Sequence, residues 1–158
     1  MTTIPLNELL IAAARVGDLE VIKELIRQNA DINTQDPKGY TPLIVACYNH
    51  QYEAAKLLIE LGANVNLADH GGNTALMGVA FKGYPDIAEL LISKGAIINL
   101  QHGNGGTALM FAAMFGRNNL LKLLLEHGAN KYLTDKMGNS VIDLALQQGN
   151  QEAISLLA

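Results

Sequence analysis

Residues 36–46 read Asp36-Pro37-Lys38-Gly39-Tyr40-Thr41-Pro42-Leu43-Ile44-Val45-Ala46, and the pattern of this stretch returns every 33 residues. The residues at its centre have a counterpart at each step: Thr41-Pro42-Leu43, Thr74-Ala75-Leu76, Thr107-Ala108-Leu109 and Ser140-Val141-Ile142. One step back reaches Glu8-Leu9-Leu10, a weaker copy. Similarity at one fixed period of this length is the signature of a protein built from stacked repeats.

The residues of each copy favour two short helices followed by a loop. A Thr or Ser before an apolar run accepts a hydrogen bond from a backbone N–H at the start of a helix, and Pro42 suits the first helical position. A glycine near the middle of most copies ends the first helix, because glycine enters the left-handed backbone region freely. Apolar residues at helical spacing then predict a second helix. One pair of short helices cannot bury its own apolar side, so the copies must stack.

These residues resemble the ankyrin repeat, whose pattern runs D-x-x-G-x-T-P-L-H-x-A-A, a glycine, a leucine-rich helix and G-A-D-V-N. Asp36–Ala46 and Gly62–Asn66 carry the resemblance best, and it covers the chain from about Leu6 to Ala158. It implies an all-α ankyrin-repeat solenoid of five helix–turn–helix units with hairpin-like loops. We therefore expect a single domain, 1–158, whose approximate units are 1–34, 35–67, 68–100, 101–133 and 134–158.

Two details refine the resemblance. The histidine of the family pattern is replaced in the four clear copies, so apolar packing is expected in place of its hydrogen bonds; these positions hold Ile44, Met77, Met110 and Asp143. The repeated Thr-Ala-Leu-Met at 74–77 and 107–110 resembles bacterial ankyrin proteins more than animal ones. The chain as a whole is similar to small stand-alone members of the family.

Composition and charge exclude several classes of protein. Of the 158 residues, 49% are hydrophobic and 16% are charged, as in a folded chain. A net charge of −4 with scattered Lys and Arg argues against nucleic acid as a partner. The single cysteine, Cys47, excludes an intramolecular disulfide and fits a reducing compartment. No apolar run approaches the ~20 residues that cross a bilayer, and no positive charge precedes Leu9–Ala14 as it would in a signal peptide, so we expect a cytoplasmic protein.

No group of residues has the spacing of a catalytic or metal site. The histidines occupy no two adjacent helical turns, although stacking could bring His70 and His102 together on neighbouring loop tips; the four are His50, His70, His102 and His127. Residues 102–106 resemble a phosphate-binding loop but lack the following Lys-Ser/Thr, so a tight hairpin is the favoured interpretation. Cys47 falls in a column of small core residues and is expected to be a buried hydrophobe. The sequence thus predicts no enzyme, no metal and no cofactor.

The resemblance implies a binding surface, because ankyrin relatives bind partners through their loop tips and the exposed side of their first helices. Tyr48, Phe81 and Met114 share one column, and a contiguous exposed apolar patch usually marks an interaction site. The alternative is that these three side chains fold back onto their neighbours, and each alanine substitution would then cost roughly 2–5 kcal/mol of stability. The residues expected to bind a partner are Tyr40, Tyr48, His70, Asn73, Phe81, Lys82, Asn104, Phe111, Met114, Phe115, Lys136 and Met137.

The sequence favours a non-catalytic adaptor or scaffold that binds another protein through its concave face and loop tips. An inhibitor or immunity-type protein that blocks a partner enzyme is the alternative, and the sequence does not separate the two. An enzyme or metal-dependent module is a remote alternative, because it would need convergent titratable groups in a pocket. We expect a protein partner, no nucleic acid, no membrane, no small-molecule substrate and a monomeric chain.

Overall fold

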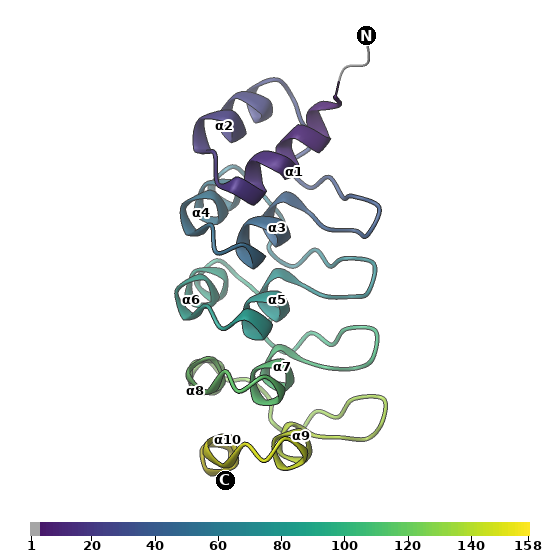
Figure 1. Ribbon diagram of the computed structural model, residues 1–158, viewed down its shortest axis with the longest axis vertical. Helices are drawn as coiled ribbons and strands as arrows, with labels where there is room; N and C mark the ends of the chain where they lie inside the picture. The colour runs from purple at the N-terminus through teal and green to yellow at the C-terminus, as the bar shows by residue number, and fades with distance from the viewer. Residues whose placement is uncertain (1–3) are drawn as a thin grey trace. The chain divides into compact units, whose positions relative to one another are not determined.

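The computed structural model describes residues 4–158, which form ten α-helices arranged in pairs (Figure 1). The first helices of the pairs are α1 (Leu6–Val16), α3 (Pro42–Tyr48), α5 (Ala75–Lys82), α7 (Ala108–Met114) and α9 (Val141–Gln147). The second helices are α2 (Leu19–Arg27), α4 (Tyr52–Glu60), α6 (Pro85–Ser93), α8 (Asn118–Glu126) and α10 (Gln151–Leu157). The predicted all-α solenoid of helix–turn–helix repeats is confirmed.

The chain divides into two compact units, Met1–Ala75 and Leu76–Ala158. In the first unit α1 packs on α2 and α3, and α4 packs on α2 and α3. In the second unit α8 packs on α6, α7 and α10, while α9 packs on α7 and α10. The expectation that all five repeats form one domain stays a prediction. Between residues 4 and 158, no helix has the length and apolarity needed to span a bilayer.

The core of each unit consists of small and branched apolar side chains. Alanines of the first helices are fully buried, among them Ala46, Ala80, Ala112, Ala113 and Ala145. Side chains of this size let neighbouring first helices approach closely, as the sequence pattern predicts. Leucines and isoleucines of the second helices fill the remaining space, among them Leu58, Ile87, Leu91, Leu120, Leu121 and Leu124.

Hydroxyl side chains begin α3, α7 and α9, as the pattern predicts. Thr41 Oγ1 accepts a hydrogen bond from the backbone N–H of Ile44 at 3.1 Å, and Thr107 Oγ1 accepts one from Met110 at 3.3 Å. At the start of α9 Ser140 and Asp143 form a reciprocal capping box. Each cap satisfies a backbone donor that the helix itself leaves without a partner.

Replacing Thr107 by alanine is expected to lower the free energy of unfolding by about 1–2 kcal/mol, at the upper end for helix caps because Thr107 is only 2% exposed. Urea denaturation followed by circular dichroism would measure the loss. Thr107→Ser is the matched control, since it keeps the hydroxyl and should recover most of the stability. Equal losses in the two variants would show that the methyl group, and not the cap, carries the effect.

Candidate functional site

An Asp side chain holds three of the four loops that precede α3, α5, α7 and α9. Asp36, Asp69 and Asp135 each use Oδ1 to accept from the backbone N–H groups two and four residues ahead, all at 2.9 Å. His102 stands in this column in the fourth repeat, and its Nδ1 accepts from the N–H of Asn104 at 3.0 Å. An imidazole nitrogen has one lone pair, so His102 Nδ1 accepts one hydrogen bond from its loop, whereas a carboxylate oxygen can accept two.

The His102 ring occupies space that a side chain fills in the other loops. Gly106 holds the position of Tyr40, Asn73 and Asn139, and a Cβ at Gly106 would lie 2.6 Å from His102 Nε2. The ring also stacks on Phe111, with centroids 5.2 Å apart. His102 and Gly106 therefore act as a pair: the missing side chain at 106 lets the imidazole lie flat against α7.

Neighbouring loops within each unit are joined by backbone and glutamine hydrogen bonds. The N–H of Lys136 donates to the carbonyl of Asn104 at 2.9 Å. Gln101 Nε2 donates to the carbonyls of Gly105 and Thr134, at 2.8 and 2.9 Å. In the first unit Gln35 makes the same two bonds, to Gly39 and Ala68. These contacts fix the loop at 102–106 against the loop at 135–138 and so define the space between them.

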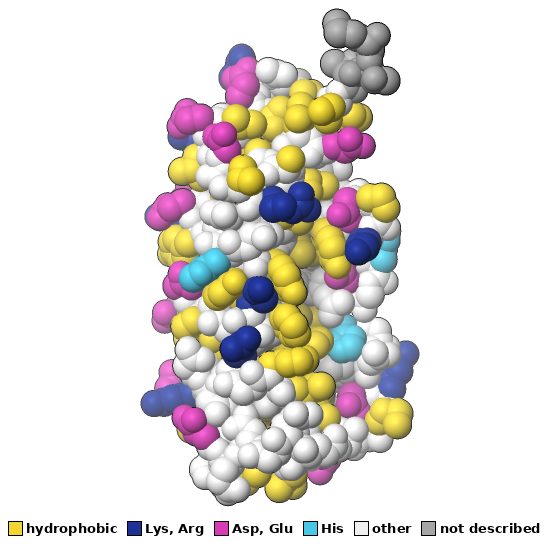
Figure 2. Space-filling view, viewed as in Figure 1, with side chains coloured by type: hydrophobic (Ala, Val, Ile, Leu, Met, Phe, Trp, Pro, Cys, Tyr) yellow, Lys and Arg dark blue, Asp and Glu magenta, His cyan; other side chains and the backbone are white. Residues whose placement is uncertain are grey.

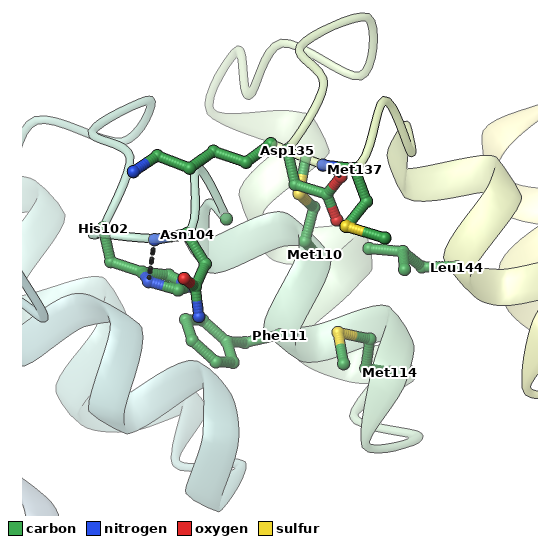
Figure 3. A pocket seen from close by; sticks show the side chains of 10 residues that line it. His102, Asn104, Met110, Phe111, Met114, Asp135, Met137 and Leu144 are labelled. Carbon is green, nitrogen blue, oxygen red and sulfur yellow. Dashed lines mark hydrogen bonds between the residues drawn. The ribbon is translucent and has the colours of Figure 1, made fainter. Parts of the chain in front are cut away.

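A pocket of about 490 Å³ lies between these two loops and helices α7 and α9 (Figure 3). Its floor is apolar, with Met110 and Leu144 buried and Phe111 and Met114 half-buried. Met137 stands at its rim and is 85% exposed. The side chains and glycine that line the pocket are His102, Asn104, Gly106, Met110, Phe111, Met114, Asp135, Lys136, Met137 and Leu144.

A row of aromatic rings continues from the pocket along the same unit. His102 stacks on Phe111, Phe111 stacks on Phe115 at 6.4 Å, and Phe115 meets Phe81 edge to face at 4.6 Å. We call these four side chains the aromatic row. Figure 2 shows hydrophobic side chains gathered over α5 and α7, with Lys and Arg side chains beside them. Phe115 is 43% exposed, so the row is in part accessible.

The structure brings together most of the residues that the sequence proposes for binding in the second unit. Five of them line the pocket: Asn104, Phe111, Met114, Lys136 and Met137. Phe81 and Phe115 belong to the aromatic row, and Lys82 ends α5 directly after Phe81. Five pocket residues are absent from the sequence-based set, namely His102, Gly106, Met110, Asp135 and Leu144.

The proposed binding residues of the first unit have different surroundings. Tyr48 is 42% exposed at the end of α3, and Tyr40 is half-buried. His70 lies over Gly39 with its Nδ1 3.1 Å from the carbonyl of Pro37, and Asn73 bonds to Asp69 in its own loop. Phe81 and Met114 are half-buried in the second unit. A binding role for the column of Tyr48, Phe81 and Met114 stays a prediction.

Titratable groups in the described residues do not converge on a reactive centre. No group of three or more His, Cys, Asp or Glu side chains between residues 4 and 158 is placed to hold a metal ion. The strongest perturbation in this region is at Cys47, where burial raises the pKa of the thiol. In α2, hydrogen bonds from Arg27 and then Gln28 lower the pKa of Glu24, an exposed surface residue, to about 2.

Cys47 is expected to resist alkylation in the native protein. The thiolate is the reactive form, and Cys47 is fully buried with a pKa above the ordinary range, so both access and ionisation are suppressed at neutral pH. Iodoacetamide labelling read by intact mass spectrometry should show no adduct in buffer and one adduct in 6 M guanidinium. Complete labelling of the folded chain within minutes at pH 7 would contradict the burial of this side chain.

Helix pairs repeating every 33 residues, with neighbouring loops joined by hydrogen bonds, define an α-helical repeat protein. The family model of ankyrin repeats (three copies) matches residues 9–102 and 79–158, and the chain belongs to the ankyrin repeat family. Ankyrin repeats are in general protein–protein interaction modules, and the family is typically non-enzymatic. A search of the curated proteins found no match.

Proposed function

We propose that this chain is a non-catalytic adaptor or scaffold that binds a partner protein through its loop tips and first helices, with the pocket between α7 and α9 as the anchor. The observation that carries the proposal is the apolar lining of that pocket beside two ordered loops. Three of its walls are methionines, Met110, Met114 and Met137. Methionine is flexible and adapts to varied apolar partners, and it is enriched where proteins bind one another.

The size of the pocket suits one large side chain of a partner. A volume of about 490 Å³ that opens between loops exceeds a single leucine or phenylalanine side chain and leaves room for the flanking main chain. Fully burying one such side chain contributes about 1.5–3 kcal/mol. A central anchor of this kind surrounded by weaker contacts is the usual organisation of a protein interface.

A lone buried cysteine suits a reducing compartment, so we place the protein in the cytoplasm. We also infer that the chain acts as a monomer toward its partner. An inhibitor of a partner enzyme would use the same surface, and the activity of a captured enzyme with and without this chain would separate inhibitor from scaffold.

Affinity capture from the source organism tests the proposal. The wild-type chain is compared with a Met114→Ala, Met137→Ala double variant, which removes the adaptable walls of the pocket while leaving the fully buried core intact. Tyr132→Ala is the control, because Tyr132 is 79% exposed and lies outside the pocket. Circular dichroism and thermal melting establish that each variant is folded.

A protein retained by the wild type and by Tyr132→Ala, and lost by the methionine variant, is the expected result. Chemical cross-links from that protein to residues 102–106 or 135–138 would support the location further. If the wild type and both variants retain the same partners, the pocket is not the anchor and the partner binds another surface of the chain.

A further inference from the structure

The charges beside the pocket differ in sign from the charge of the whole protein. The chain carries −4, yet the charged residues that line the pocket, end the helix of Phe81, cap the row at Arg117 or begin α9 are three Lys or Arg and two Asp. These five residues are Lys82, Arg117, Asp135, Lys136 and Asp143. The second helices of this unit hold most of its acids, namely Asp86, Glu89, Glu126 and Glu152.

The two acids near the pocket are both used within the chain. Asp135 Oδ1 accepts from the N–H groups of Met137 and Asn139, at 2.9 Å each. Asp143 Oδ2 accepts from the N–H and the hydroxyl of Ser140, at 2.9 and 3.0 Å. Both carboxylates keep their charge, but their bonded oxygens face the donors of the loop and the helix start, and neither carboxylate lies within ion-pair distance of Lys136 or Arg117 among residues 4–158.

Lys136 and Arg117 mark the two ends of the pocket and aromatic row. Lys136 lines the pocket, and its backbone N–H is fixed on Asn104 of the neighbouring loop. Arg117 lies at the far end, where its Nε donates to the carbonyl of Phe81 at 3.0 Å. Both side chains are exposed, and neither has a carboxylate within ion-pair distance among residues 4–158. Arg27 in α2, by contrast, is paired with Glu24.

We propose that the site takes an acidic linear segment of the partner, in which one large apolar side chain enters the pocket and flanking carboxylates pair with Lys136 and Arg117. This inference rests on the proposed function and names the chemistry of its partner. The apolar lining supplies affinity, because buried apolar area is the main favourable term in association. The exposed cations supply orientation and partner choice, since rim charges act mainly on specificity and on the rate of association.

The same cations fit a single nucleic acid strand less well. Strand-binding sites stack bases on open aromatic faces, whereas the aromatic row uses its faces internally: His102 covers Phe111, and Phe111 lies against Phe115. The net charge of −4 also disfavours binding of an extended phosphate backbone.

Selection from a random dodecapeptide library displayed on phage, with the purified full-length chain as bait, tests the inference. The expected consensus has one Leu, Met or Phe with Asp or Glu on both sides. A fluorescent synthetic peptide of that consensus is then titrated against the wild type and against a Lys136→Glu, Arg117→Glu double variant. Lys94→Glu, Lys122→Glu is the matched control, because it changes the net charge equally at two exposed positions outside the pocket, the C-cap of α6 and the surface of α8.

Reversing both rim charges is expected to weaken binding by about ten-fold or more, while the control stays within about two-fold. Binding of the wild type should also weaken as salt rises, because exposed pairs are screened. Lys136→Glu alone, at a loop tip, serves as a second variant because Arg117 also bonds to Phe81. A several-fold loss in this single variant supports the inference.

Four results would overturn the inference. One is a consensus without acidic residues, and another is equal weakening in the charge-reversal and control variants. The third is tighter binding of mixed-sequence single-stranded RNA than of any selected peptide, and the fourth is no enriched peptide. Neutral peptides lost by the Met114→Ala, Met137→Ala variant would overturn only the acidic occupant and leave the protein-binding function standing. If captured partners bind through another surface, both the pocket as the anchor and the acidic segment as its occupant are contradicted.

Discussion

Gly105→Ala is expected to lower the free energy of unfolding by about 2–4 kcal/mol, one of the largest effects of any single-methyl change in this chain. Gly105 has φ +83°, in the left-handed region that costs other residues about 1–2 kcal/mol. A Cβ there would also lie 2.9 Å from the backbone nitrogen of Lys136 and 3.0 Å from Asp135 Cα. Backbone atoms cannot rotate away, so the two loops that hold the pocket must separate.

Gly138→Ala is the matched control for this prediction. Gly138 stands one repeat later with φ +82°, and a Cβ there would meet nothing within 4 Å. In Gly138→Ala the free energy of unfolding should therefore fall only by the cost of placing alanine in the left-handed region, about 1–2 kcal/mol. Urea denaturation of both variants measures the difference, and binding of a selected peptide should fall in Gly105→Ala far more than in Gly138→Ala. Equal losses of stability in the two variants would mean that the loop at 135–138 moves away from an added Cβ at position 105 at little energetic cost.

These two glycines also show what the sequence could and could not predict. Both belong to one column at the 33-residue period, and that period predicts the helices, the caps and the loops correctly. The pattern cannot distinguish them, because their difference lies in what stands opposite each one. A contact between neighbouring loops depends on the path of two backbones, which residue identity at one position does not specify.

The residues of the candidate site also fall into those that the sequence could predict and those that it could not. Asn104, Phe111 and Lys136 could be placed from their columns, since loop tips and first helices are positions that repeat. Met110 was expected to serve packing alone, in place of the family histidine, and it is 2% exposed yet still lines the pocket. His102 was expected to be a loop residue without a special role. Its part in the site depends on the missing side chain of Gly106, a pairing across four residues that no single column reveals.

The charged residues beside the pocket are harder to predict from the sequence than its apolar lining. The overall charge of −4 suggests an acidic surface, and the sequence shows no basic run. Folding places most acids of the second unit on the second helices and engages Asp135 and Asp143 in hydrogen bonds. Lys136 and Arg117 are then left beside the apolar surface. Which cations remain without an ion-pair partner follows from where folding places the acids, and composition alone does not specify that.

Leu124→Ala is expected to cost about 3–5 kcal/mol, because Leu124 is fully buried and α8 packs on helices of three pairs. Leu123→Ala is the control: it is the adjacent residue of the same type, half-buried, and should cost about 1 kcal/mol. Urea denaturation of the two variants would measure the difference, and equal losses would contradict the assignment of the core side of α8.

The loss of stability in Leu124→Ala should first increase local opening of the C-terminal repeat, under conditions in which the rest of the second unit stays folded. In a repeat protein each pair of helices is stabilised mainly by its neighbours, so weakening α8 removes support from α10, and α9 rests on α7 and α10. Amide hydrogen exchange read by mass spectrometry should show faster exchange in α8, α9 and α10, with little change in α1–α4. Because α9 contributes Leu144 to the pocket, peptide binding should weaken together with this protection, although Leu124 does not itself line the pocket. Unchanged exchange in α9 and α10 would mean that the last repeat is stable by itself, and the pocket would then survive the loss of Leu124.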